Sequence, residues 1–200
     1  MMGKKTSIVL TGVGGQGVIT AANILGKAAV KAKIDIFVSE IHGMAQRGGA
    51  VNCTARMGDV SSPLVAMGTA DAIISTEPVE VLRNITYANK KTIVITDVNP
   101  VVPYTVAVGG EKYPDLKDVY SEVKTRAILY KIDALKIAKE SGAAITKNIV
   151  MLGALAASNI LPFKSSVLLE TILENVPAKY KDINKKAFEG GMKALTDIKK

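Results

Sequence analysis

The stretch TSIVLTGVGGQGVITAAN, residues 6–23, decides the fold of this chain. An apolar run at 8–10 predicts a buried strand, a glycine cluster follows it, and an alanine-rich pattern with helical spacing begins at once. A helix N-terminus carries free N–H groups and the positive end of the helix dipole, so such a turn is suited to an anion such as a phosphate. Gly12, Gly14 and Gly17 also match G-x-G-x-x-G, the glycine pattern of dinucleotide-binding folds.

Outward from this stretch, apolar strands alternate with helical patterns. After the helix at 16–32, strands are expected at 34–38, 71–75, 92–96 and 126–130, and helices at 77–88, 112–123, 134–141, 146–159, 167–175 and 178–200. Thr76 is expected to cap the helix at 77–88, and Ser165 or Ser166 the helix at 167–175. Gly190-Gly191 is expected to be a weak point or a kink in the last helix. The alternation predicts an α/β fold with a Rossmann-like, doubly wound and mainly parallel sheet, a helical C-terminal third, and a single domain over 1–200.

One segment predicts antiparallel pairing. Apolar and polar residues alternate over 51–57, which is typical of a strand that is buried on one face. A turn at Gly58-Asp59 and a short apolar piece at 63–66 then predict a hairpin. Cys53 lies on the apolar face of this strand, so we interpret it as a small core residue.

Composition excludes several classes of site. Cys53 and His42 are the only cysteine and the only histidine, so a disulfide, a multi-histidine metal centre or an iron–sulfur cluster held by this chain alone is not expected. The absence of Trp argues against a nucleic-acid reader built on stacking. The longest weakly polar stretch, 149–161, is too short to span a membrane, and a cytoplasmic protein is expected. The net charge of +8 fits a solvated lysine-rich surface, or attraction to an acidic partner or phosphorylated ligand.

The segment SEIHGMAQRGG, residues 39–49, breaks the strand-and-helix alternation. Polar groups gathered in a glycine-rich loop, next to a glycine-rich turn, predict a site or an interface; its candidates are Glu40, His42, Gln46, Arg47, Gly48 and Gly49. Arg47 could pair with a phosphate or carboxylate, or lock a subunit interface. His42 could move a proton, or could serve only as a hydrogen-bonding side chain.

Three interpretations of the opening glycines stay open. In a stand-alone NAD(P)- or nucleotide-binding Rossmann-like protein, Glu40 would take the place of the acidic residue that binds the ribose. Against this stand the Gly15-Gln16 pair inside the motif and the lack of a substrate-binding half. Alternatively, the glycines serve only close strand–helix packing, or they hold a phosphate of a ligand in a binding module or enzyme subunit.

Taken together, the motifs resemble the gamma-type domain of 2-oxoacid:ferredoxin oxidoreductases, and within that family the beta (small) subunits of the indolepyruvate type. The form EIHGMAQRGG points to that type. The resemblance covers nearly the whole chain and is carried by GVGGQGV (12–18), SEIHGMAQRGG (39–49), VNCTAR (51–56), KNIVMLGA (147–154) and AFEG (187–190).

The resemblance implies an accessory subunit that supports oxidative decarboxylation of a 2-oxoacid, with the acyl group passed to coenzyme A and the electrons to ferredoxin. Thiamine diphosphate, Mg²⁺ and 4Fe-4S clusters would sit on a large alpha subunit, in an α2β2 complex, and this chain would be inactive alone. The residues expected near the coenzyme A phosphates are Gly12, Gly14, Gly15, Gln16 and Gly17.

Overall fold

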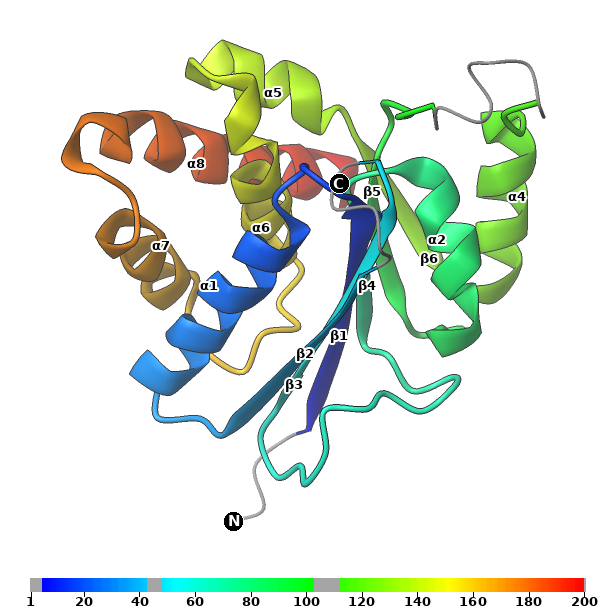
Figure 1. Ribbon diagram of the computed structural model, residues 1–200, viewed down its shortest axis with the longest axis horizontal. Coiled ribbons are helices and arrows are strands. Elements are labelled where there is room, and N and C mark those ends of the chain that lie inside the picture. The colour runs from blue at the N-terminus through cyan, green and yellow to red at the C-terminus, as the bar shows by residue number, and fades with distance from the viewer. Residues whose placement is uncertain (1–4, 43–47, 103–111, 200) are drawn as a thin grey trace.

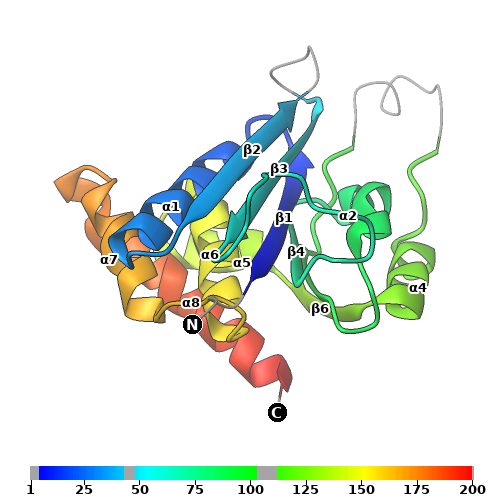
Figure 2. The ribbon, with the colours of Figure 1, turned by 90° about the horizontal axis from the view of Figure 1, so that it is seen from below.

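The computed structural model describes residues 5–42, 48–102 and 112–199. Six strands form one mixed sheet in the order β2-β3-β1-β4-β5-β6. Helices cover both faces (Figures 1 and 2). The strands are β1 Thr6–Val13, β2 Ile36–His42, β3 Ala50–Met57, β4 Ala72–Ser75, β5 Ile93–Asp97 and β6 Ile128–Ile132. The expected α/β fold is confirmed, with three parallel and two antiparallel pairings.

The pairing of β2 differs from the expectation. The strand that follows the first helix does not lie beside β1, because β3 is inserted between them and runs antiparallel to both. The antiparallel hairpin exists, but it is formed by β2 and β3. No strand lies at 63–66, so the hairpin predicted over 51–66 is wrong. Instead, Arg56 donates hydrogen bonds to the carbonyls of Ser62 and Leu64, which hold that segment against β3.

Successive side chains of β1 enter two different hydrophobic cores, one on each face of the sheet. Ile8 and Leu10 face the larger core, which is shared with α1 Val18–Lys31, α6 Lys147–Ala157, α7 Ser165–Glu174 and α8 Lys181–Lys199. Val9 faces the smaller core on the opposite side of the sheet. There it meets side chains of α2 Pro78–Asn84 and α4 Leu116–Arg126. Successive strand residues point to opposite faces, so β1 is buried on both.

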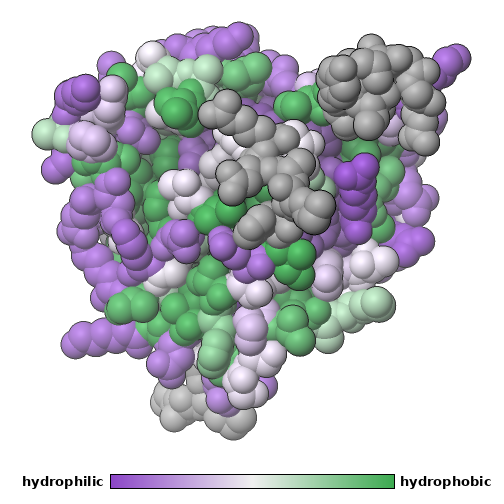
Figure 3. Space-filling view, in the orientation of Figure 1, coloured by the Kyte–Doolittle hydropathy of each residue, from purple (hydrophilic) through white to green (hydrophobic). Residues whose placement is uncertain are grey.

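The remaining short elements join these layers. They are η1 Ile85–Tyr87, α5 Ala134–Ser141, η2 Ala144–Thr146 and η3 Ala178–Tyr180. Gly142 ends α5 with a φ of 120°, as its position predicts. The extended piece expected around 105–108 lies outside the described residues. In Figure 3, hydrophilic side chains gather on the side formed by α1, α7 and α8, in agreement with a lysine-rich surface. Across the described part of the chain, no helix combines the length and apolarity that crossing a membrane requires.

Two helix starts were predicted wrongly. Glu77 rather than Thr76 caps α2, because its longer side chain accepts from the Glu80 N–H at 3.0 Å. Helix α7 begins at Ser165, and Lys164 takes the N-cap position without a side-chain hydrogen bond.

Glycines let α6 and α8 approach closely. Helix α8 continues through Gly190-Gly191 without a break. A Cβ on Gly191 would lie 2.0 Å from the Val150 carbonyl oxygen, and one on Gly153 would lie 2.0 Å from the Phe188 carbonyl oxygen. These two positions therefore require glycine for helix–helix contact.

Candidate functional site

The site lies where the carboxyl ends of β1, β4 and β5 meet the N-termini of α1 and α6. Gly17 takes the N-cap position of α1 with a φ of 77°, and no side chain caps the helix. The first turn also carries no acidic residue. Four N–H groups at a helix start lack intrahelical partners, so this end of α1 presents free donors and a positive dipole.

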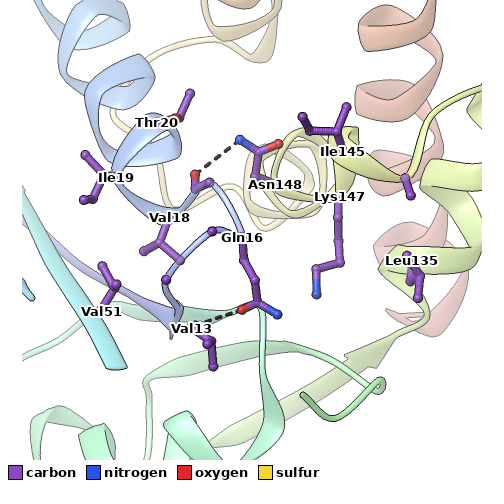
Figure 4. A pocket seen from close by; sticks show the side chains of 14 residues that line it. Val13, Gln16, Val18, Ile19, Thr20, Val51, Leu135, Ile145, Lys147 and Asn148 are labelled. Atoms are coloured by element: carbon purple, nitrogen blue, oxygen red, sulfur yellow. Dashed lines mark hydrogen bonds between the residues drawn. The ribbon is translucent and has the colours of Figure 1, made fainter. Parts of the chain in front are cut away.

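Neighbouring groups fix the side chain of Gln16. Its Oε1 accepts from the Val13 N–H at 2.9 Å and from the Thr76 hydroxyl at 2.6 Å. A backbone N–H can only donate, so the atom that faces it must be the amide oxygen. The amide nitrogen of Gln16 therefore points away from Val13, toward the side on which Lys147 lies (Figure 4).

Gly12 makes room for this arrangement. A Cβ at that position would lie 1.9 Å from Thr76 Oγ1 and 2.9 Å from Gln16 Oε1. The first glycine of the motif thus lies behind the turn. Its lack of a side chain admits the hydroxyl of Thr76 to Gln16.

Lys147 lies at the back of the site with a buried partner. Its ammonium contacts Asp97 Oδ2 at 3.1 Å and donates to the Thr76 carbonyl at 2.9 Å. Asp97 is fully buried, and its other oxygen accepts from the Ala134 N–H and from Asn99. The opposite charges of Lys147 and Asp97 offset each other, so the N-terminus of α1 supplies most of the positive potential at the site.

Asn148 joins α6 to the glycine turn. It donates from Nδ2 to the Gly17 carbonyl at 3.2 Å, and a Cβ on Gly17 would lie 2.7 Å from that nitrogen. Gly17 is therefore required both for its positive φ and for close contact with Asn148.

Together these elements enclose a cavity of about 730 Å³. One wall is the α1 turn, another is the start of α6, and apolar side chains complete it (Figure 4). The lining residues are Val13, Gly14, Gly15, Gln16, Gly17, Val18, Ile19, Thr20, Val51, Leu135, Ala144, Ile145, Lys147 and Asn148. A polar, donor-rich end beside apolar walls suits an anionic group on a larger, partly apolar ligand.

The two glycine-rich segments meet here, as predicted. The Gly14 N–H donates to the Gly49 carbonyl at 2.8 Å, and the Gly48 N–H donates to the Gly14 carbonyl at 3.4 Å. Gln46 and Arg47 lie outside the described residues, so their predicted roles stay predictions. Of His42, the structure describes only its place as the last residue of β2.

Glu40 does not lie in a loop, and that prediction is wrong. It lies within β2, opposite Cys53, and Cys53 in turn lies opposite Leu10 of β1. Glu40 is thus in register with Leu10 in the middle of β1. Its strand lies two strand spacings from β1, which is roughly 10 Å. The ribose-binding acid of a dinucleotide fold lies at the end of the strand beside β1, and Glu40 is not in that place.

Comparison with known proteins identifies the family. The model for the pyruvate ferredoxin/flavodoxin oxidoreductase family matches residues 7–194. The chain belongs to this family. It is 43% identical over 198 residues to the indolepyruvate oxidoreductase subunit IorB of Pyrococcus horikoshii, with 98% of each chain covered. The resemblance drawn from the motifs is confirmed.

Two solved oxidoreductase structures share the fold. The gamma subunit of a keto/oxoacid ferredoxin oxidoreductase from Geobacter sulfurreducens superposes with a TM-score of 0.71 at 22% identity, covering 96% of this chain and 99% of that one. The 2-oxoglutarate:ferredoxin oxidoreductase from Magnetococcus marinus, solved with 2-oxoglutarate, coenzyme A and succinyl-CoA bound, gives 0.73 at 22% identity, covering 97% of this chain and 31% of that one.

No place in the site was predicted for Thr76, Asp97, Lys147 or Asn148, and Thr76 was expected only to cap a helix. Two signals pointed to them. Thr76 and Asp97 come at the ends of buried strands, where ligands of open α/β sheets bind. Lys147 and Asn148 are polar residues that open an otherwise apolar helix.

A second buried polar group lies on the opposite side of the sheet. Glu77 is buried and accepts from the Tyr113 hydroxyl. Burial raises the pKa of the nearby Glu80 carboxyl, the Arg83 guanidinium at 2.8 Å lowers it, and the charge of Glu77 raises it further. Burial, together with the hydrogen bond to Glu77, raises the pKa of Tyr113 strongly.

Cys53 is a core residue, as predicted. Its side chain is fully buried in the larger core. Burial raises the pKa of its thiol to about 11, and the charge of Glu40 on the neighbouring strand adds to the shift. A thiol that is buried and protonated at neutral pH is a poor nucleophile.

Proposed function

We propose that this chain is the accessory subunit of an indolepyruvate-type, aryl 2-oxoacid ferredoxin oxidoreductase. The similarity to IorB, which extends over 98% of both chains, supports this assignment. In this complex the 2-oxoacid is decarboxylated oxidatively, the acyl group passes to coenzyme A, and the electrons pass to ferredoxin. This chain would be inactive alone.

We further propose that the chain binds the phosphates of coenzyme A at the turn of Gly14, Gly15, Gln16 and Gly17. The open N-terminus of α1, facing a cavity of about 730 Å³, is the observation that carries this proposal. Free N–H groups and the helix dipole recognise the phosphate, and the oriented amide of Gln16 adds a donor. Lys147 lies at the back of the cavity, where a third ammonium N–H remains for the ligand beyond its contacts with Thr76 and Asp97.

The remaining cofactors belong to the partner in this proposal. The chain's single cysteine is buried in the core, whereas a 4Fe-4S cluster needs about four thiolates. Thiamine diphosphate with Mg²⁺ and the clusters would therefore lie on a large alpha subunit, in a cytoplasmic α2β2 complex. Thiamine diphosphate supplies carbanion stabilisation for the decarboxylation. The segment 39–49 is the expected contact with that subunit.

Co-expression with the large subunit tests the assignment. We expect the two chains to co-purify and to reduce a viologen dye with an aryl pyruvate and coenzyme A, whereas this chain alone gives no reduction. Failure to associate with any thiamine-diphosphate-binding chain would refute the proposal.

Two variants test the phosphate turn. Gly14→Asp places a carboxylate where the phosphate would bind, and it should raise the KM for coenzyme A by roughly a hundredfold while association persists. Gly14→Ala adds the same Cβ without charge and is the matched control. Equal effects of the two variants would argue for a steric role only.

A further inference from the structure

A second cavity adjoins the phosphate turn. It encloses about 630 Å³ and runs along α1, between that helix and the segments η2, η3 and α8. Thr20, Ile145 and Asn148 line both cavities, so the two lie side by side. We call this second cavity the α1 groove.

One helical stripe forms the floor of the α1 groove. Thr20, Asn23, Ile24 and Lys27 stand at positions i, i+3, i+4 and i+7, which places them on one face of α1. At a rise of about 1.5 Å per residue, Lys27 lies roughly 10 Å beyond Thr20 along the helix axis. Cα–Cβ bonds in a helix tilt toward its N-terminus, so the Lys27 side chain starts out in the direction of the glycine turn.

The charge of Lys27 is not matched by a carboxylate among the described residues. Its ammonium contacts the amide oxygen of Asn175, a neutral group, at the far wall of the groove. The two acidic residues of the neighbouring helix α7 pair instead with Lys31, at 3.2 Å for Glu170 and 2.7 Å for Glu174. Lys27 is therefore a cation that lines a cavity and whose hydrogen-bond partner there is a neutral amide.

We propose that the α1 groove completes a binding site for a nucleotide that carries two separate phosphate groups, and that Lys27 binds the second phosphate. The proposal rests on the proposed function, since it assigns the first phosphate position to the glycine turn. Coenzyme A has this chemistry: a 5′-diphosphate and a 3′-phosphate lie on opposite sides of one ribose. The diphosphate meets the α1 terminus, and the 3′-phosphate lies along the groove toward Lys27.

This orientation also places the rest of the ligand. With the nucleoside end in the α1 groove, the thiol arm leaves the turn past Val51 and Leu135, the apolar walls of the first cavity. That arm then emerges beside Gly48 and Gly49, at the end of the segment 39–49 that is expected to meet the large subunit. The reactive thiol is thereby directed toward the partner's chemistry.

The test compares coenzyme A with 3′-dephospho-coenzyme A, which differs only at the second phosphate. Each is titrated by calorimetry into the full chain, as wild type and as Lys27→Ala. We expect the wild type to bind coenzyme A about tenfold more tightly, because a charge-assisted contact is lost in the analogue. Lys27→Ala should bind both ligands equally, with the affinity that the wild type has for the analogue.

Lys31→Ala is the matched control, one turn further along α1 and outside the groove, and it should keep the tenfold preference. Equal binding of both ligands by the wild type, or a preference that persists in Lys27→Ala, would overturn the proposal for the groove but leave the glycine turn intact. Gly14→Asp should weaken both ligands alike. Absence of binding by the wild type would overturn the phosphate turn as well as the groove.

Discussion

Replacing Lys147 with Met should destabilise the protein severely. The change keeps a straight side chain of similar length but removes the ammonium that faces Asp97 at 3.1 Å. Asp97 is fully buried, and Lys147 is only 9% exposed, so water cannot replace the lost partner. Breaking a buried ion pair in this way costs about 3–5 kcal/mol, and the bond to the Thr76 carbonyl is lost as well.

Urea unfolding followed by circular dichroism measures this loss. With a denaturant slope of about 3 kcal/mol per molar urea, a loss of about 4 kcal/mol lowers the midpoint by a little more than 1 M. Asp97→Asn provides the second arm of a double-mutant cycle, because the asparagine oxygen can still accept from the Ala134 N–H.

The double variant Lys147→Met with Asp97→Asn should recover most of the lost stability, since no uncompensated charge is left in the core. A single variant within about 1 kcal/mol of wild type would contradict the reasoning. So would a double variant that is no more stable than Lys147→Met, because the loss could then not come from an unpaired carboxylate.

Three shorter predictions follow from buried groups. Gly191→Ala should lower the thermal midpoint by an amount equivalent to about 1–3 kcal/mol, because its Cβ would lie 2.0 Å from the Val150 carbonyl oxygen. Gly26→Ala in α1 is the control. Its Cβ would meet only a side-chain methyl at 3.3 Å, so this variant should be neutral or stabilising. The Cys53 thiol, with a pKa of about 11, should react with Ellman's reagent at pH 8 only after urea unfolds the chain; rapid labelling of the folded protein would contradict its burial. Because the pKa of Glu80 is raised, the folded state holds the Glu80 proton to higher pH than the unfolded state does. The stability that this carboxyl contributes therefore falls as pH rises above its unfolded pKa near 4.5. Urea unfolding of Glu80→Gln at a series of pH values should lack this pH-dependent loss of stability.

The local elements were predictable because their signals are local. Continuous apolar runs identified β4 and β5, and the glycine after Ser141 identified the end of α5. Strand β2 was predicted to end at Val38 because polar residues follow it. An edge strand accepts polar side chains, so the pairing with β3 continues through His42.

Long-range arrangement was not predictable in the same way. Nothing near β1 in the sequence indicates that β3 enters the sheet beside it, since that order depends on contacts between distant segments. In the site, too, the local features were predictable and those that depend on distant residues were not. The glycine turn was predicted from its own residues, whereas Thr76 and Lys147 acquire their roles through Gln16 and Asp97, which lie 60 and 50 residues away.

The close contact of α6 with α8 sets an order for biosynthesis. Chains emerge from the ribosome with the N-terminus first, so β1 and the glycine turn are available early. The wall opposite that turn belongs to α6, which lies against α8 at Gly153 and Gly191. Because α8 comprises the last 19 described residues, a nascent chain cannot hold α6 in its final place. The cavity is therefore completed only once α8 has been synthesised, and a truncation that removes α8 would disable a site whose lining comes largely from residues 13–20.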